Sequence, residues 1–168
     1  MSKSLDIQIS TSEVIFRVQN VSHISSQVAE ATKRLDAVAA PMVQADDDEN
    51  NEALICDAIQ AAIGTLQTAL HEYISSFSYG DVDSLVEAIR NRNVLVFHFA
   101  LTDNYQTNAI DAVISAMNDY IVNRTLAEWY TVADTSQASV YLEKANGNLV
   151  DLLKSIYRRK RPNRPLTK

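Results

Sequence analysis

Apolar residues recur along most of the chain at helical spacing, but two short stretches follow the pattern of strands. In residues 5–9, Leu5, Ile7 and Ile9 alternate with polar residues, which predicts a half-buried strand. The stretch VLVFHFAL, residues 94–101, is rich in strand-forming side chains, lacks a helical period and predicts a second strand. Because a lone strand is not stable, we expect these two to pair.

The remaining apolar periodicity predicts four long helices. Ser10 and Glu13 have the spacing of a capping box at the start of the first helix, and Asp134 is placed to cap the last one. A shorter helix is expected over residues 82–91, with Asp81 as its cap. The short connection TVADTS requires the last two helices to form an antiparallel hairpin. The long helices are predicted at residues 11–39, 52–77, 106–132 and 135–157.

Length and composition are consistent with this pattern. A chain of 168 residues is expected to form one domain, and three glycines and three prolines favour long helices with few tight turns. The predicted fold class is therefore mainly α: a bundle of about four long helices with a small two-stranded β element. We assign the bundle to residues 1–157 and an extended C-terminal arm to residues 158–168.

The charge of the chain is divided unevenly between these two parts. The net charge is −6, yet residues 158–168 hold six basic residues and no acidic ones. Residues 1–157 then hold nine basic and 21 acidic residues, which gives them a net charge of −12. Negative charge is thus concentrated in the body and positive charge in the arm, and we expect the arm to attract a negatively charged partner.

No pattern in the sequence predicts a catalytic centre, a metal site or a cofactor. His23, His71 and His98 are far apart and lack metal-binding spacing, and there is no phosphate-binding glycine loop or di-iron motif pair. The carboxylates of residues 46–49 lack the alternation and glycine of a calcium loop, so a solvated loop is expected. Cys56 is expected to be a small core residue. We therefore predict that the protein is not an enzyme.

No apolar run is long enough to span a membrane, and the N-terminal segment MSKSLDIQIS lacks the apolar region of a secretory signal. We accordingly expect no membrane partner. The protein is expected to be made in a cytoplasm, and either to be used there or to be assembled there into a particle.

Aromatic and basic residues near the C-terminus are the candidates for partner binding. Trp129 and Tyr130 could anchor an interface, although the favoured interpretation places Trp129 in the core and Tyr130 at its edge. The arm could lie in a protein groove with its arginines paired to carboxylates, neutralise nucleic-acid phosphates, or only improve solubility. The partner-binding candidates are Trp129, Tyr130, Tyr157, Arg158, Arg159, Lys160, Arg161 and Arg164.

One long stretch resembles a known group of proteins. The sequence DAVISAMNDYIVNRTLAEWYTVADTSQASVYLEKANGNLVDLLKSIYRRKRPNRP resembles a family of uncharacterised proteins of Bacteroides phages and prophages. The shared features are a helix ending in a tryptophan, here Trp129, the pattern A..Y...A beginning at Ala138, and the closing motif IY.RK.P.RP. The match covers about a third of the chain well and departs from the family in the acidic loop after Pro41.

The resemblance implies a role in virion morphogenesis. A small helical bundle with a C-terminal extension is also similar to phage head–tail connector, or adaptor, proteins. Those proteins form a ring beneath the portal and insert their C-terminal arm into it. The resemblance therefore implies a virion protein that forms a homo-oligomeric ring and binds the portal or a neighbouring connector or tail protein. Nucleic-acid association through the arm is the alternative.

Overall fold

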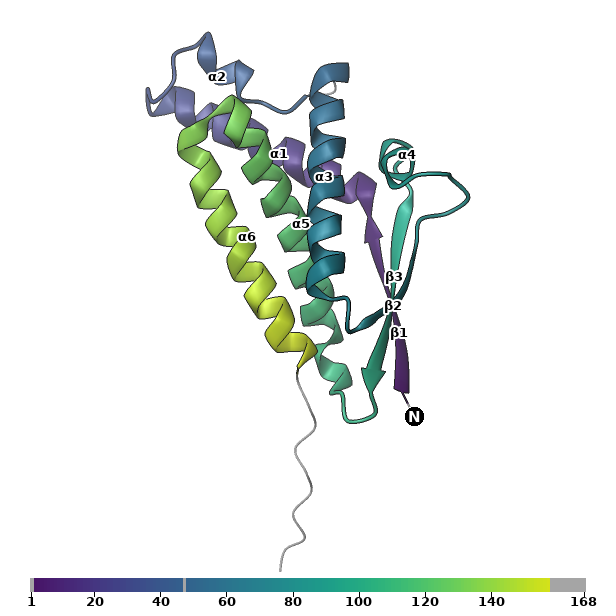
Figure 1. Cartoon of the computed structure of the whole chain (residues 1–168). Coiled ribbons are helices and arrows are strands. Elements are labelled where there is room, and N and C mark those ends of the chain that lie inside the picture. The colour runs from purple at the N-terminus through teal and green to yellow at the C-terminus, as the bar shows by residue number, and fades with distance from the viewer. Residues whose placement is uncertain (1, 47, 158–168) are drawn as a thin grey trace, which may run out of the picture.

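The computed structural model describes residues 2–46 and 48–157, which form a helical bundle packed against one face of a small antiparallel sheet (Figure 1). The strands are β1 (Ser2–Ser10), β2 (Ile74–Ser78) and β3 (Val94–Thr102). The helices are α1 (Thr11–Ala31), α2 (Ala39–Met42), α3 (Glu49–Ala69), α4 (Leu85–Arg90), α5 (Ile110–Ala133) and α6 (Thr135–Ile156), with a single 3₁₀ turn, η1 (Thr107–Ala109), before α5. The mainly helical class is confirmed.

The sheet has the order β1-β3-β2, with β3 in the centre. The expected pairing of the first strand with residues 94–101 is confirmed, because β1 and β3 are antiparallel from Ser2 opposite Thr102 to Ser10 opposite Val94. Alternate residues of β3 are buried against the helices, as the pattern of a sheet covered on one face requires. The expectation of only two strands was wrong, because β2 pairs with the other edge of β3.

The third strand was missed because residues 52–77 were predicted to be one helix. The structure ends α3 at Ala69, with the Leu70 N–H still bonded to the Leu66 carbonyl at 2.9 Å. The sequence ISSFS follows as β2, with a register irregularity between Ile74 and Ser76. Tyr73, Ile74 and Phe77 fit a helical period as well as they fit a strand, so their spacing does not separate the two structures.

Helix α1 is also shorter than the prediction of residues 11–39. It stops at Ala31, where the Thr32 hydroxyl donates to the Val28 carbonyl at 2.7 Å and Lys33 takes a positive φ of 55°. A side-chain hydroxyl that competes for a helix carbonyl, followed by a left-handed residue, is a common way to end a helix. A turn and the single helical turn α2 then lead back toward the bundle.

Two of the three predicted N-caps are confirmed. The Ser10 side chain accepts a hydrogen bond from the Glu13 N–H at 3.4 Å, and Asp134 accepts from the Ser136 N–H at 3.1 Å. The prediction of Asp81 as a cap was wrong, because Ser84 caps α4 by accepting from the Glu87 N–H at 3.2 Å. A serine three residues before a glutamate makes the better cap, since its hydroxyl reaches that N–H directly.

Helix α5 is the centre of the bundle and packs against α1, α3 and α6. Its buried residues join a single core that runs from Ile7 on the sheet to Ile156 at the end of α6. The predicted antiparallel hairpin of α5 and α6 is confirmed (Figure 1). The predicted seam of α6 is only partly buried, because Leu142 is exposed while Ala145 and Leu152 lie in the core. None of the helices in the described parts of the chain is long and apolar enough to cross a membrane.

Candidate functional site

A groove with a volume of about 290 Å³ lies between the N-terminal half of α3 and the C-terminal end of α5. Its floor includes Ala58 and the side chain of Trp129, which is only 6% exposed. Its rim carries Leu54 and Val132, which are 45% and 73% exposed. The α3–α5 groove, as we call it, is lined by Leu54, Asp57, Ala58, Ala61, Glu128, Trp129 and Val132.

Local structure explains why this groove is open and apolar. The indole N–H of Trp129 donates to the Val43 carbonyl at 2.9 Å, which fixes the ring against the segment that follows α2. Ala58 and Ala61 are too small to fill the space beside the ring. Large apolar side chains that stay exposed around a groove mark a surface that can bind a partner.

Two carboxylates give the α3–α5 groove a negative charge. Glu128 is partly neutralised by Arg124, which lies 2.6 Å away one helical turn earlier. Asp57 makes no ion pair with any other described residue and is exposed. An apolar floor with a free carboxylate at its edge suits a ligand that combines apolar and cationic groups.

A second groove, of about 300 Å³, lies between α1 and α6. It is lined by Val21, Ile24, Ser25, Val28, Arg34, Gln137 and Tyr141. Tyr141 stacks on the buried Tyr130 with ring centroids 5.2 Å apart, and burial raises the pKa of both tyrosines. Arg34 bonds to Asp134 at 2.6 Å and closes one end of the groove with a paired charge.

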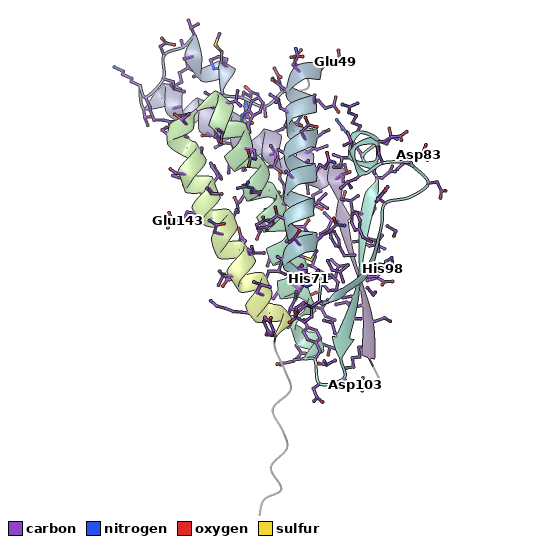
Figure 2. All side chains as sticks on the ribbon, in the orientation of Figure 1. Glu49, His71, Asp83, His98, Asp103 and Glu143 are labelled. Atoms are coloured by element: carbon purple, nitrogen blue, oxygen red, sulfur yellow. The ribbon has the colours of Figure 1, made fainter. Side chains whose placement is uncertain are left out.

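The outer face of the sheet carries a hydrogen-bonded array of three residues. His98 lies on the central strand β3 (Figure 2). Its Nδ1 is 2.7 Å from the Asp6 Oδ1 on β1, and its Nε2 is 3.3 Å from the Ser78 Oγ on β2. This is the order of groups in a hydrolase triad. The array lies on the outer face of the sheet, and neither of the two grooves is lined by any of its three residues. We therefore assign it to cross-strand stabilisation.

The candidate partner-binding residues fall into three groups in the structure. Trp129 and Tyr130 are buried, which favours core positions for both, although Trp129 also forms part of the α3–α5 groove. Tyr157 is 56% exposed and packs edge-on against Tyr73 with ring centroids 5.6 Å apart. The others, Arg158, Arg159, Lys160, Arg161 and Arg164, lie outside the described residues.

Within residues 2–46 and 48–157, no three His, Cys, Asp or Glu side chains converge as the ligands of a metal ion would. Cys56 is buried, as expected, and burial raises the pKa of its thiol. In the loop before α3, Asp46 accepts from Asn51 at 2.5 Å and from the Asp48 N–H at 3.2 Å, and these hydrogen bonds lower its pKa. This carboxylate is used to order the loop.

Comparison with models of known protein families, with curated proteins and with solved structures gives no match. The site therefore rests on the chain's own residues. Sequence reasoning singled out Trp129 but missed the α3–α5 groove, because a helical period identifies buried positions and not the gap that small residues leave. It also missed the array of Asp6, Ser78 and His98, whose members are brought together only by the sheet.

Proposed function

We propose that the protein is a structural protein of a tailed-phage virion, a head–tail connector subunit that forms a ring. Its basic C-terminal arm, residues 158–168, docks on a neighbouring virion protein, such as the portal or the next connector subunit. The observation that carries the proposal is the pairing of a body of net charge −12 with an arm of charge +6 on the same chain. Opposite charges on one subunit favour repeated association of subunits and suppress stacking of like surfaces.

Two further features support this proposal. The sequence from Asp111 to Pro165 resembles phage and prophage proteins, and the closing motif of that resemblance is the arm itself. The helical body leaves two apolar grooves open, and a ring subunit needs unlike surfaces that meet by rotation. The proposed role is binding and assembly, and the helix surfaces and the arm would fulfil it without catalysing a reaction.

The proposal is tested by removing the arm in the phage that encodes the chain. We expect truncation after Tyr157 to give heads without attached tails in electron micrographs, while the full-length chain gives complete particles. Mass spectrometry of purified wild-type particles should detect the chain in several copies. Complete, infectious particles assembled with the truncated chain would overturn the proposal.

The basic arm also favours a second candidate, a nucleic-acid-associated helical protein whose arm neutralises phosphates. Six basic residues predict a log–log slope of binding constant against salt of about −5 for duplex DNA. Fluorescence anisotropy with a labelled duplex between 50 and 200 mM salt measures this slope, and the chain truncated after Tyr157 is the control. No binding at the lowest salt would remove this candidate.

A further inference from the structure

The α3–α5 groove combines an apolar floor, exposed apolar rim residues and an unpaired carboxylate, Asp57. We propose that this groove binds the C-terminal arm, residues 158–168, of a second copy of the chain. The inference rests on the proposed ring assembly and deepens it, because it names the surface on one subunit that receives the arm of the next.

The sequence of the arm complements the groove, because it combines positive charges with apolar residues. The arm holds six cationic side chains, two prolines and Leu166. Its arginines can form charge-assisted hydrogen bonds with carboxylates such as Asp57. Proline has no backbone N–H to leave unsatisfied against apolar side chains, and proline-rich segments are commonly bound in aromatic-lined grooves. Trp129 supplies an aromatic ring at the floor.

The charge around the groove favours the same occupant. Residues 46–57, which lead into α3 and form its first turns, contain six acidic residues and no basic ones. Glu49, at the start of α3, lies at the end of the bundle away from the last turn of α6 (Figure 2). The acidic surface and the point where the arm begins are thus at opposite ends of the molecule, which suits head-to-tail contact between copies.

The arm of the same copy is the competing occupant of the groove. Tyr157, the last described residue, packs against Tyr73 just beyond the C-terminal end of α3. The groove residue Ala61 lies eight residues, about 12 Å, before that end of the helix. An extended segment of about four residues crosses such a distance. The two occupants differ in assembly state, because an arm bound to its own subunit leaves the wild type monomeric.

The first test measures association of the full-length chain by sedimentation at 50 mM salt. We expect wild type to form concentration-dependent oligomers larger than dimers. Asp57→Lys should weaken the association at least tenfold, because it places a positive charge where the arm binds. Glu143→Lys is the matched control, since it makes the same change in charge on an exposed position of α6 away from α3 (Figure 2). Equal behaviour of the two variants, or a monomeric wild type, would overturn the inference.

The second test mixes two full-length variants that each lack one half of the interface. One is Asp57→Lys, and the other carries Arg159→Glu, Arg161→Glu and Arg164→Glu. Each alone should be monomeric. Their equimolar mixture should form a heterodimer and nothing larger, because one intact groove and one intact arm remain. A mixture that stays monomeric, or an arm variant that still forms oligomers, would contradict the inference.

Failure of this inference can be told apart from failure of the proposed function. If the arm variant also blocks head–tail joining while Asp57→Lys supports it, the arm binds a different virion protein. That result overturns the second-copy assignment and leaves the connector role in place. If both variants give complete particles, the connector role itself is wrong.

Discussion

At the scale of single residues, Trp129 shows how one side chain can be both core and surface. Its ring is almost entirely buried, and its N–H donates to the Val43 carbonyl at 2.9 Å. One part of the ring still contributes to the α3–α5 groove. The hydrogen bond joins α5 to the segment between α2 and α3, so it also sets where that segment lies.

Trp129→Phe should keep most of the apolar contact and remove this hydrogen bond. We expect a loss of about 1–3 kcal/mol in the free energy of unfolding, because the buried Val43 carbonyl loses its donor and the smaller ring packs less well. Urea unfolding followed by circular dichroism measures this loss. The exposed neighbour Val132→Ala is the control and should change the free energy of unfolding by less than about 0.5 kcal/mol. Equal losses in the two variants would contradict this account.

Asp134 connects the α5–α6 turn to α1. Its carboxylate caps α6 through the Ser136 N–H and bonds to Arg34 at 2.6 Å. Burial opposes ionisation here, but the hydrogen bonds from Ser136 and the nearby Arg34 guanidinium outweigh it and lower the pKa of Asp134. A lowered pKa in the folded state means that the charged form stabilises the fold.

Asp134→Ala should therefore cost stability in a pH-dependent way. At pH 7 we expect a loss of about 1–2 kcal/mol, the usual range for a lost N-cap. The contribution of the charge is complete above the ordinary pKa of 3.8 and is lost as the pH falls through the lower pKa of the folded state. The difference in the free energy of unfolding between wild type and variant should thus become smaller below about pH 4. Unfolding curves at pH 7, 5 and 3 measure this difference, and a difference that grows at acidic pH would contradict the account.

At the scale of elements, the sequence was informative where one period dominates. The alternation of Leu5, Ile7 and Ile9 predicted β1, and the α5–α6 hairpin followed from a short polar connection. Strand β2 could not be predicted, because its apolar residues also continue the helical period of α3 and only pairing with β3 selects the strand. The α3–α5 groove depends on packing between distant helices, which no local pattern reports.

Substitutions of two glycines would test the backbone conformations inside α3 and after β2. Gly64 lies inside α3 with no atom within 4 Å of an added Cβ, so Gly64→Ala should raise the free energy of unfolding by about 0.5–1 kcal/mol. Gly80 follows β2 with a φ of +90°, and an added Cβ would lie 3.3 Å from the Asn93 side chain. Gly80→Ala should lower the same free energy by about 1–2 kcal/mol. Thermal and urea unfolding compare the two, and the same sign for both would be inconsistent with these backbone assignments.

At the scale of the whole molecule, the sheet and the helices share one core, which runs from β1 to the end of α6. Arg17 on α1 adds a link to Asp119 on α5 at 2.7 Å. A continuous core of this kind predicts a single cooperative unfolding transition for the body. The arm contributes six of the 15 positive charges and reduces the net charge from the −12 of the body to −6.

Truncation after Tyr157 should leave this cooperative unit intact while changing its net charge from −6 to −12. We expect the same helical content and one calorimetric transition. At low salt the melting temperature should fall, because repulsion within the body increases, and added salt should restore it. Scanning calorimetry at 20 and 500 mM salt measures both effects. Two separate transitions in the truncated chain would show that the sheet and bundle unfold independently.

The pairing of β1 with β3 has a consequence for the protein during its own synthesis. Each residue of β1 meets a partner at least 84 positions later in the chain. At translation rates of roughly 5–20 residues per second, β1 waits about 4–17 s after it is made before β3 has been synthesised. During that interval Ile7 and Ile9, which are buried in the finished fold, have no sheet to cover them. We therefore expect the nascent N-terminal strand to be a binding site for a ribosome-associated chaperone.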